Sequence, residues 1–588
     1  MRICVLLSSY EGPGEELEEL RQVATVLPQP GGCTADHIFE YRWICKHTAE
    51  KQIDALAAEK FDFYINLMCG TVDDPIAGAF ASRYFESLGL PSCGIPSRER
   101  AMTKTDFFKI ARSRGAPPVP GTGRFPLVVQ PAKGIASQLS HKKVICHDQL
   151  ELDVAISDMS NALYEARLRR AEHEKGFVDS DDLVWHGRED IVFQEVVNGQ
   201  DYTVTIVEMA EACLALAPVT YYTKETAMQN KFSTFQLKLE ADTCFELVRK
   251  EERPALYVLL QMTAIDGFLA SGCRGGNMGC KVDIRVTPDG GVFVMDVSPQ
   301  PAEFLPESQF QDFAIMHSLP GGHSALINIF IANHMVRKNV HRKGLDAIAG
   351  AYNEFASEYD ATATSSVEVA IRDLANEYDF DGTVFDLGCG TGIFGRMLAE
   401  RNTTTGSQKT GRLIGFDISP QMLAICRDSS AYDAVHIESM EAALINCRRY
   451  AESIDHIVCL SAIHFLSPEM FSFVLVLCFA LANKSITINI DEIPDSYNDH
   501  LEKINRGFMH SRNHLASMEA FGEPPGWRLT RGKSQYSWTS PATGDDVNST
   551  YFRFDRVGDA QSLIFRDPEF TNQFSRDTEA VLGRVASV

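Results

Sequence analysis

The sequence lacks the features of a membrane protein and of a disulfide-bonded secreted protein. The apolar run FSFVLVLCFALA (Phe471 to Ala482) is too short to span a bilayer and is expected to form a buried helix. The first residues, MRICVLLSSY, have no cationic segment before their apolar core, so they are expected to form a buried strand and not a signal peptide. The 15 cysteines form no paired CxxC framework, which favours scattered reduced thiols in a cytoplasmic protein.

Positive charge is also scarce. The chain has 55 Lys and Arg against 79 Asp and Glu, a formal net charge of -24, whereas nucleic acids and anionic membranes bind clustered positive charge. Neither is therefore expected as a partner. No internal repeat is present, and 588 residues are too many for one hydrophobic core. We expect a globular chain of about two to four domains.

The most specific local pattern is VFDLGCGTG (Val384 to Gly392). Three apolar residues surround Asp386 in a predicted buried strand, three alternating glycines form a turn, and a helical pattern follows. Glycines let backbone N–H groups approach a ligand where a side chain would collide with it. A second predicted strand, LIGFDIS, ends in Asp417. In a doubly wound sheet, an acid at this place can accept hydrogen bonds from both ribose hydroxyls of a nucleoside.

These residues resemble the class I S-adenosylmethionine-dependent methyltransferases over about residues 350 to 500. The resemblance implies a Rossmann-like fold with S-adenosylmethionine as cofactor. It places Asp386 in the acidic position of the first motif, Asp417 at the ribose, and three glycines along the methionine part of the cofactor (Gly388, Gly390 and Gly392). A NAD-binding Rossmann domain is the alternative. Its fingerprint is G-x-G-x-x-G, whereas here the third glycine comes two residues after the second.

Other segments extend this resemblance. YNEFASEYD (352–360) looks like the helix that opens many small-molecule methyltransferases, and HIVCLSAIHFL (456–466) looks like the fourth strand and the loop over the transfer site. His464 in that loop is a candidate catalytic base, and packing beside Phe465 is the alternative.

The adenine contact has two candidates. His436 lies where the family contacts adenine, but an acid is commoner there, so Glu438 competes with it. From about Asn498 the aromatic and histidine residues suggest a substrate cap and the last strands, with core packing as the alternative for most aromatics.

The first half alternates strand and helix patterns up to residue 102, which predicts an α/β unit. A helix ended by Gly115 follows. DIVFQEVVNGQDYTVTIVEM (190–209) predicts two strands joined as a hairpin through Asn198-Gly199. A second hairpin, 279–301, turns at PDGG and carries Asp283 and Asp296. Antiparallel pairing can bring these two carboxylates onto one face, as a divalent ion between phosphate oxygens requires.

In this order the segments resemble the ATP-grasp superfamily, specifically its D-alanine–D-alanine ligase-like branch, over about residues 1 to 335. The resemblance implies that ATP and Mg²⁺ are bound. It implies nucleotide contacts from Lys104, from the phosphate loop with Ser137, from the hinge, from Asp201 at the ribose and from Lys238. The hinge residues are Gln194, Glu195 and Val197, and the metal ligands would be Asp283, Asp296 and Ser298.

Three positions depart from this family's pattern. Gln130 stands where a phosphate-binding lysine is usual, and Lys133 is a candidate substitute. Ser298 replaces an asparagine ligand. Lys281 replaces an arginine that would stabilise the reacting acyl phosphate; it keeps the charge but loses the bidentate fork, and Arg285 is a candidate to contribute. These changes leave two interpretations, a diverged working ligase or a domain that binds without activating, and the working ligase is favoured.

The expected architecture is multidomain, α/β and α+β. An N-terminal ATP-grasp part consists of a pre-ATP-grasp α/β domain (1–102) and two α+β lobes (103–335). The helix HSALINIFIANHM (323–335) would close it, a linker would cover 336–350, and a Rossmann-like class I methyltransferase with its cap would cover 351–588.

The expected protein is a bifunctional enzyme. It would join a carboxylic acid to an amine, both expected to be amino acids, and would methylate nitrogen or oxygen. A homodimer is compatible with this expectation. A single-activity methyltransferase with a binding or regulatory first half is the alternative, and a non-catalytic binding protein is a third hypothesis.

Overall fold

We examined the fold in a computed structural model. It describes residues 1–11, 28–70, 76–98, 102–132, 144–173, 191–223, 243–304, 312–362, 365–406, 411–540, 543–558 and 562–569. The chain divides into two compact units, the first containing Met1–His317 and the second Ser318–Pro568.

The boundary between the units lies earlier than the sequence suggested. Helix α11 (Gly322–Arg337), which was expected to close the first domain, belongs to the second unit and packs against α17 (Pro468–Leu481). Asn328 of α11 donates a hydrogen bond to the hydroxyl of Ser472 at 3.0 Å. Every residue from Ala325 to Asn333 is buried, so α11 needs cover on all sides, and α17 is buried in the same way. The expected linker 336–350 is also largely helical, because α12 (Arg342–Thr362) begins within it.

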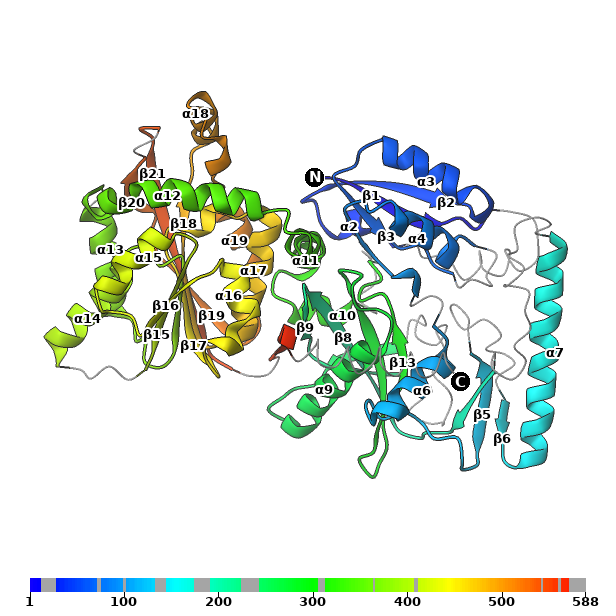
Figure 1. Ribbon diagram of the computed structural model, residues 1–588. Coiled ribbons are helices and arrows are strands. Elements are labelled where there is room, and N and C mark those ends of the chain that lie inside the picture. Colours follow the sequence, from blue (N-terminus) through cyan, green and yellow to red (C-terminus); the bar gives the residue numbers. More distant parts are fainter. Residues whose placement is uncertain are drawn as a thin grey trace. The chain divides into compact units, whose positions relative to one another are not determined.

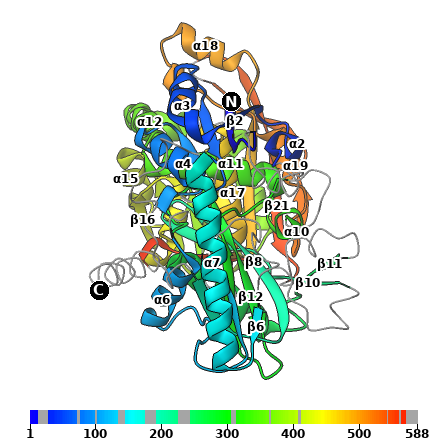
Figure 2. The ribbon, with the colours of Figure 1, turned by 90° about the vertical axis from the view of Figure 1, so that its right-hand side faces the viewer.

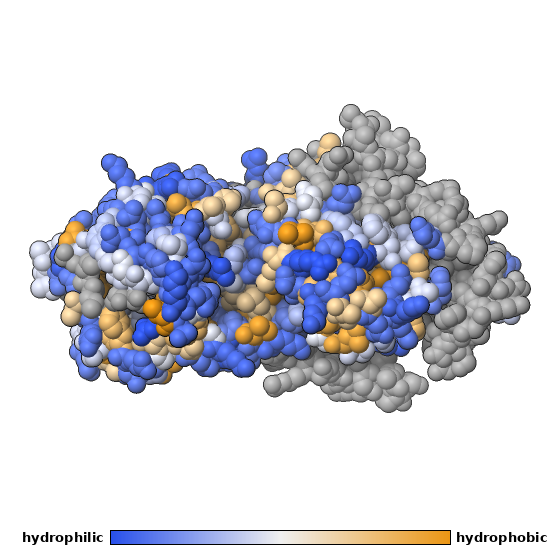
Figure 3. Space-filling model, turned by 90° about the horizontal axis from the view of Figure 1, so that it is seen from above, coloured by the Kyte–Doolittle hydropathy of each residue, from blue (hydrophilic) through white to orange (hydrophobic). Residues whose placement is uncertain are grey.

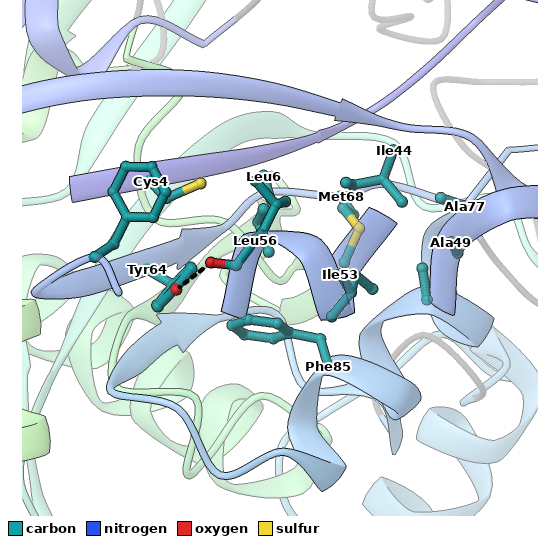
Figure 4. Close-up of a cluster of buried hydrophobic side chains, with 12 residues drawn as sticks. Cys4, Leu6, Ile44, Ala49, Ile53, Leu56, Tyr64, Met68, Ala77 and Phe85 are labelled. Carbon is teal, nitrogen blue, oxygen red and sulfur yellow. Dashed lines mark hydrogen bonds between the residues drawn. The ribbon is translucent and has the colours of Figure 1, made fainter. Parts of the chain in front are cut away.

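The first unit opens with a parallel sheet in the order β2-β1-β3-β4. Its strands and helices are β1 (Arg2–Ser8), α2 (Pro30–Cys33), β2 (Ile38–Ile44), η1 (Lys46–Thr48), α3 (Ala49–Ala58), β3 (Phe63–Asn66), α4 (Gly78–Ser87) and β4 (Ser92–Gly94). Figure 4 shows its core, where Leu6 of β1, Ile53 of α3 and Phe85 of α4 meet. The hydroxyl of Tyr64 in this core donates to the carbonyl of Leu56 at 3.0 Å. The predicted α/β character is confirmed, and the bound at residue 102 stays a prediction. The helix expected at 15–27 lies outside the described residues, and so do Asp74 and Pro75, which were expected to begin the helix of residues 74–90.

A three-stranded antiparallel sheet follows, in the order β6-β5-β7. Helix α6 (Lys104–Arg114) precedes it, begins at a capping box between Thr103 and Asp106, and ends at Gly115 with φ 73°, as predicted. The long helix α7 packs on β5 and β6, and Figure 2 shows this helix facing the viewer. The bounds are β5 (Leu127–Pro131), β6 (Val144–Cys146), α7 (Gln149–His173) and β7 (Ile191–Glu195).

A second antiparallel sheet has the order β11-β10-β8-β12-β13, with β9 beside β8 and α9 packed on it. The bounds are β8 (Gln200–Met209), β9 (Ala212–Ala215), β10 (Val219–Thr223), β11 (Thr243–Leu247), α9 (Pro254–Ala270), β12 (Gly279–Val286), β13 (Val292–Ser298) and α10 (Phe313–Ser318). The predicted hairpin of β12 and β13 is confirmed.

The other predicted hairpin is wrong. Strands β7 and β8 belong to different sheets, so Asn198-Gly199 connects two sheets and does not turn a hairpin. Gly199 passes so close to β12 that a Cβ atom there would lie 2.1 Å from the carbonyl oxygen of Val286. Close packing against a neighbouring strand, and not hairpin geometry, is what requires glycine here.

The second unit is built on a sheet in the order β16-β15-β14-β17-β18-β21-β19, with β20 beside β21 (Figure 1). The strands from β16 to β18 are parallel, and β21 runs antiparallel to β18. The strands are β14 (Val384–Leu387), β15 (Leu413–Asp417), β16 (Ala434–Ile437), β17 (Ile454–Cys459), β18 (Ala482–Glu492), β19 (Trp527–Arg531), β20 (Gln535–Thr539) and β21 (Asp546–Arg556). The short strand β22 (Ile564–Arg566) does not belong to this sheet. Chain order reverses at β14, and ligands of such sheets bind at the strand ends beside this reversal.

Helices cover this sheet. They are α13 (Ser365–Glu377), α14 (Ile393–Thr405), α15 (Pro420–Asp428), α16 (Met440–Ile445), η4 (Cys447–Arg449), η5 (Ile463–Phe465), α17, α18 (Tyr497–Lys503), η6 (Gly507–Met509) and α19 (Leu515–Phe521). The predicted strands at 384–387 and 413–417 are confirmed, and so is the buried helix in the apolar run from Phe471.

On the face in Figure 3, hydrophobic residues lie in small groups among hydrophilic ones. Among the described helices, none combines the length and the apolar character that crossing a membrane requires. The cysteines are free thiols, as expected.

A buried ion pair joins the turn before α12 to α16. The Nε2 atom of His341 lies 2.9 Å from Oε1 of Glu441, and the two side chains are 16% and 5% exposed. Burial lowers the pKa of His341, but the hydrogen bond and charge of Glu441 outweigh it, so the pKa is raised above 6.5. Burial raises the pKa of Glu441, but the bonds from His341 and Ser439 outweigh it, so the pKa falls below 4.5. The charged forms of both groups are therefore stabilised by folding.

We predict that His341→Gln lowers the free energy of unfolding of the second unit by about 3 kcal/mol, because it leaves Glu441 buried without its cation. The contribution of His341 is complete below pH 6.5 and is lost as pH rises through its raised pKa. That of Glu441 is complete above pH 4.5 and is lost as pH falls through its lowered pKa. The difference in free energy of unfolding between the parent protein and His341→Gln, measured with urea, should therefore be largest between pH 4.5 and pH 6.5.

Arg342→Gln is the matched control. Arg342 and Asp346 form an exposed pair on α12, with side chains 68% and 62% exposed, and their loss should cost no more than about 0.5 kcal/mol. Equal effects of the two substitutions at every pH would contradict the role given to the buried pair.

Candidate functional site

In the second unit, the first candidate site lies at the end of β15. The Oδ2 atom of Asp417 accepts the N–H of Gly390 at 2.9 Å, and Oδ1 accepts the N–H of Ser419 at 2.8 Å. Burial raises the pKa of Asp417, and these backbone hydrogen bonds oppose the rise. The backbone donors Gly390, Ile418 and Ser419 do not use all four lone pairs of the carboxylate. Asp417 can therefore still accept a hydroxyl, which a ribose offers.

Two glycines of the turn differ in what surrounds them. Gly390 has φ 53°, and a Cβ atom built there would meet nothing within 4 Å. Gly388 has φ 73°, and a Cβ atom there would lie 2.5 Å from Cβ of Ala462. Gly388 is therefore needed for packing against the loop after β17, while Gly390 leaves open space beside Asp417. The residues of this turn fit a nucleoside-type cofactor such as S-adenosylmethionine.

Asp386 lies in β14, two residues before the first glycine of the turn. Its carboxylate is buried, and Oδ2 accepts the hydroxyl of Tyr432. The same hydroxyl accepts the N–H of Gly395 in α14 at 3.2 Å. Burial raises the pKa of Asp386 to about 7, although the bond from Tyr432 opposes this. The described contacts of Asp386 thus connect the strand to the beginning of the following helix.

The two adenine candidates have different surroundings. The N–H of Glu438 donates to the carbonyl of Asp417 at 3.1 Å, so Glu438 stands at the same end of the sheet as the ribose acid. The Oε1 atom of Glu438 accepts the hydroxyl of Tyr450 at 3.0 Å. The ring of His436 stacks on Phe416 with centroids 5.7 Å apart.

Helix α12 is attached to both loops that flank Asp417. The Oδ1 atom of Asn353 accepts the hydroxyl of Ser419 at 2.7 Å. Further along α12, Asp360 accepts the hydroxyl of Thr391 and pairs with Arg396 at 2.9 Å. The sequence predicted a helix here but not these polar contacts, since only the fold brings their partners to it.

His464 has an acidic neighbour that the sequence did not predict. Its Nδ1 atom lies 2.8 Å from Oδ2 of Asp491, near the end of β18, and the side chains are 5% and 0% exposed. The expected packing also occurs, because the rings of His464 and Phe465 have centroids 4.2 Å apart. An acid within the apolar strand pattern ITINIDEI was the available signal.

In the first unit, the two predicted metal ligands face each other. Asp283 of β12 and Asp296 of β13 are cross-strand partners, so they lie on one face as expected. The Oδ1 atom of Asp283 accepts the hydroxyl of Thr203 at 2.6 Å. Lys104 reaches this pair, with Nζ 3.7 Å from Oδ1 of Asp296, whose side chain is 62% exposed. Ser298 is opposite Lys281 in the same hairpin.

The two cationic candidates of β12 are engaged in ion pairs. Nζ of Lys281 lies 2.6 Å from Oε1 of Glu303, an acid that the sequence analysis missed. Arg285 binds Asp201 through two hydrogen bonds of 2.6 and 2.9 Å and donates to the carbonyl of Val197 at 3.0 Å. In this arrangement Arg285 connects the predicted hinge to the predicted ribose acid.

The hinge residues also bind one another and the preceding loop. The Nε2 atom of Gln130 donates to Oε1 of Gln194 at 3.3 Å, and both side chains are buried. The Oε1 atom of Glu195 accepts the N–H groups of Gly123 and Arg124 at 3.3 and 3.1 Å. Three further predicted nucleotide contacts lie outside the described residues: Lys133, Ser137 and Lys238.

The fit of a magnesium ion rests on oxygen donors alone. Among the described residues, no group of three or more His, Cys, Asp and Glu is arranged to hold a metal. Mg²⁺ commonly keeps several waters and is held by one or two carboxylates together with substrate phosphates. Asp283 and Asp296 supply such a pair, so these residues fit Mg²⁺ that arrives with a nucleotide.

Comparison with known proteins assigns the class of the second unit. Residues 384–483 match the family model described as a methyltransferase domain. The chain therefore carries a methyltransferase domain, and the match begins at β14 and includes the glycine turn and Asp417.

Individual relatives match parts of the chain. A malonyl-[acyl-carrier protein] O-methyltransferase of Serratia marcescens is 35% identical over 86 residues, which are 14% of this chain. This match spans about a third of that relative, 31% of its length. The magnesium protoporphyrin IX methyltransferase of Synechocystis PCC 6803 with bound SAM aligns with TM-score 0.23 and 16% identity, over 32% of this chain and 77% of that one. The VanG D-Ala:D-Ser ligase of Enterococcus faecalis aligns with TM-score 0.35 and 16% identity, over 57% of this chain and 99% of that one.

We predict that Asp417→Asn weakens S-adenosylmethionine binding about 30-fold or more, because each lost charge-assisted hydrogen bond is worth about 2 kcal/mol. Isothermal titration calorimetry of the full chain measures this. Asp428→Asn, an exposed acid at the end of α15, is the control and should bind like the parent protein. Unchanged affinity in Asp417→Asn would remove this residue from the site.

The glycines give a second prediction. Gly390→Ala should abolish S-adenosylmethionine binding and lower the free energy of unfolding by only about 1 kcal/mol, the cost of a positive φ for alanine. Gly388→Ala should destabilise the protein more, since its new methyl group collides with Ala462. Calorimetry and thermal unfolding of both variants separate the two effects. The opposite order of stabilities would contradict this assignment.

Proposed function

We propose that the protein is a bifunctional enzyme of small-molecule metabolism. Its first unit would act as an ATP-dependent carboxylate–amine ligase, and its second as an S-adenosylmethionine-dependent methyltransferase. The two activities would act in sequence on one amino-acid-derived compound, with methylation on nitrogen or oxygen. The net charge of -24 argues against nucleic acid or an anionic membrane as partner. A cytoplasmic location and a possible homodimer belong to the same proposal.

The geometry around Asp417 carries the methyltransferase half of the proposal. Backbone N–H groups from Gly390 and Ser419 orient the carboxylate beside the open space at Gly390. S-adenosylmethionine, when bound, supplies an already activated methyl group. The protein then mainly has to align the acceptor for in-line displacement and exclude water.

The facing pair of Asp283 and Asp296, with Lys104 beside it, supports the ligase half. ATP with Mg²⁺ would supply the phosphoryl group that converts a carboxylate into an acyl phosphate, which an amine then attacks to give an amide. The carboxylates would hold the cation, and Lys104 would carry positive charge to the phosphates. An amide such as a dipeptide is the natural class of product.

A single-activity methyltransferase is the second candidate, and two contacts favour it. Lys281 is paired with Glu303 at 2.6 Å, so its charge is already balanced. Gln130, where the resemblance implies a phosphate-binding lysine, is buried against Gln194. Both contacts suit a first unit that binds a substrate or regulates without activating it. The bifunctional proposal remains the better one because Asp283, Asp296 and Lys104 keep the chemistry of the ligase site.

We predict that Asp283→Ala abolishes ligation and spares methyl transfer, because it removes one of the two facing carboxylates of the first unit only. The assay incubates the full chain with ATP, Mg²⁺, S-adenosylmethionine and pooled amino acids. ADP release and product masses report the two activities separately, since an amide and a methyl group change the mass by different amounts.

Asp289→Ala is the matched control, because Asp289 is an exposed acid in the turn of the same hairpin. It should keep both activities. The parent protein could instead form no ADP, or form ADP at a rate that does not depend on the added amino acids. If methyl transfer is intact, either result would favour the single-activity alternative. Loss of both activities in Asp283→Ala would indicate unfolding or a shared site.

A further inference from the structure

We propose that Asp491 positions His464 as the general base of the methyltransferase unit, which makes the methyl acceptor a hydroxyl or protonated amine and not a carboxylate. This inference rests on the proposed methyltransferase function and deepens it. It assigns a role to Asp491 and specifies the chemical class of the acceptor. The common property of the two acceptor groups is a heteroatom that carries a proton at neutral pH.

The loop that carries His464 lies against the candidate cofactor site. Ala462, two residues before His464, is the residue that a Cβ atom at Gly388 would strike. On the other side, the ring of Phe465 meets that of Tyr352 in α12, with centroids 5.9 Å apart. Tyr352 is close enough to both Asp417 and Asp491 for their charges to raise its pKa, although burial is the larger cause. The loop that carries His464 is therefore packed against the glycine turn that holds the ribose acid.

The carboxylate of Asp491 is held in one orientation. Its Oδ1 atom accepts the amide of Asn489 at 3.2 Å and the hydroxyl of Ser549. Asn489 also binds Ser461, accepting its N–H and donating to its hydroxyl, so it connects the carboxylate to the loop after β17. The remaining oxygen, Oδ2, accepts no hydrogen bond from a described residue and lies 2.8 Å from Nδ1 of His464. A fully buried carboxylate with this set of partners is stable only as part of such a network.

This arrangement determines which nitrogen of His464 can act as the base. Neither Nδ1 of His464 nor Oδ2 of Asp491 has a hydrogen bond in the described structure, and a small turn of the ring would align them. A carboxylate only accepts hydrogen bonds, so the tautomer that satisfies both buried atoms carries its proton on Nδ1. The lone pair is then on Nε2. Among the described residues, Nε2 has no hydrogen-bond partner, and the side chain remains 5% exposed. A base oriented by a buried acid, with its free nitrogen unengaged, is the arrangement that proton abstraction requires.

The titratable groups around this pair favour the same acceptor class. Four tyrosines from three elements are near Asp491: Tyr352 and Tyr359 of α12, Tyr497 of α18 and Tyr551 of β21. Burial raises the pKa of each, so they are neutral at pH 7. Burial lowers the pKa of His514 to about 4, with smaller effects from His464 and Arg512, so it is also neutral. Asp417 and Asp491 thus supply negative charge, which would repel a carboxylate acceptor and attract an ammonium group.

The proposed step is balanced. The proton of the acceptor would pass to Nε2 of His464, before the attack for a protonated amine and during it for a hydroxyl. The acceptor heteroatom then uses its lone pair to form a bond to the methyl carbon as the bond from that carbon to the cofactor sulfur breaks, and the sulfonium becomes a neutral thioether. Asp491 stabilises the imidazolium, which later releases the proton to water. A carboxylate acceptor has no such proton, so this pair would contribute nothing to its methylation.

The first experiment does not need a known acceptor. Nitrogen NMR of the full chain labelled at histidine, with S-adenosylhomocysteine added, should show His464 as the Nδ1–H tautomer, assigned by its loss in His464→Gln. Asp491→Asn should change this signal, whereas Glu492→Gln, the neighbouring acid that accepts from Thr550, should not. An Nε2–H tautomer, or a signal indifferent to Asp491→Asn, would overturn the proposal whether or not methyl transfer is detected.

The second experiment measures transfer of labelled methyl from S-adenosylmethionine to pooled amino acids, amino alcohols and phenols. The label should stay on the product in alkali, because N-methyl groups and methyl ethers resist it. Alkali-labile methyl esters would overturn the proposal. Asp491→Asn should lower kcat about 100-fold with little change in KM, and Asp491→Glu should restore part of the rate.

A double variant separates positioning from a structural role. If Asp491 acts through His464, then Asp491→Asn should cost almost nothing in a His464→Gln background, since the losses are not additive. Losses that multiply would contradict the proposal. Calorimetric titration with S-adenosylmethionine tests the proposed methyltransferase function independently. If the parent protein does not bind S-adenosylmethionine, that function is rejected. The NMR result still decides the role of Asp491.

Discussion

The hydrogen bonds that hold Asp417 are the constraint on which much of the second unit depends. To place this carboxylate at the end of β15, the chain needs the positive φ of Gly390 on one side and the N–H of Ser419 on the other. The surrounding elements then attach to the same two loops. Asn353 binds Ser419, and Asp360 binds Thr391, so α12 is fastened beside the site at two points. The same region also holds the loop of His464, because Gly388 leaves room for Ala462. The proposed cofactor site and the proposed acceptor site therefore share one group of contacts.

The first unit uses a different principle, in which buried or half-buried charges occur in opposed pairs. Arg285 and Asp201 join β12 to β8 at the predicted hinge, and Lys281 and Glu303 form a second pair near the facing acids. Such pairs satisfy charges that would be costly to bury alone, and each fixes the place of two chain segments. They also bear on the ligase proposal, since a lysine already paired with an acid differs chemically from the free arginine fork expected of that family.

Local patterns predicted most of the individual elements but not how they are assigned to sheets and units. The strand before the glycine turn, the strand ending at Asp417 and the hairpin of Asp283 and Asp296 each depend on neighbouring residues, and each is present. Asn198-Gly199 has hairpin composition, yet it joins two sheets, because the pairing partners of β7 and β8 come from distant parts of the chain. Helix α11 was recognised as a helix but assigned to the wrong side of the boundary, since its partner α17 is far along the sequence.

By itself, the sequence determined the elements and the site residues whose geometry is local: the glycine turn, the acid at a strand end, and the two carboxylates that antiparallel pairing makes neighbours. Backbone conformation and pleat alternation act over a few residues, so composition and spacing reveal them. Only the tertiary structure decided that Asp491 faces His464, that Glu303 neutralises Lys281 and that Asn353 binds the loop after β15. These contacts join residues far apart in the chain, and their formation depends on how the sheets and helices pack, which no local pattern encodes.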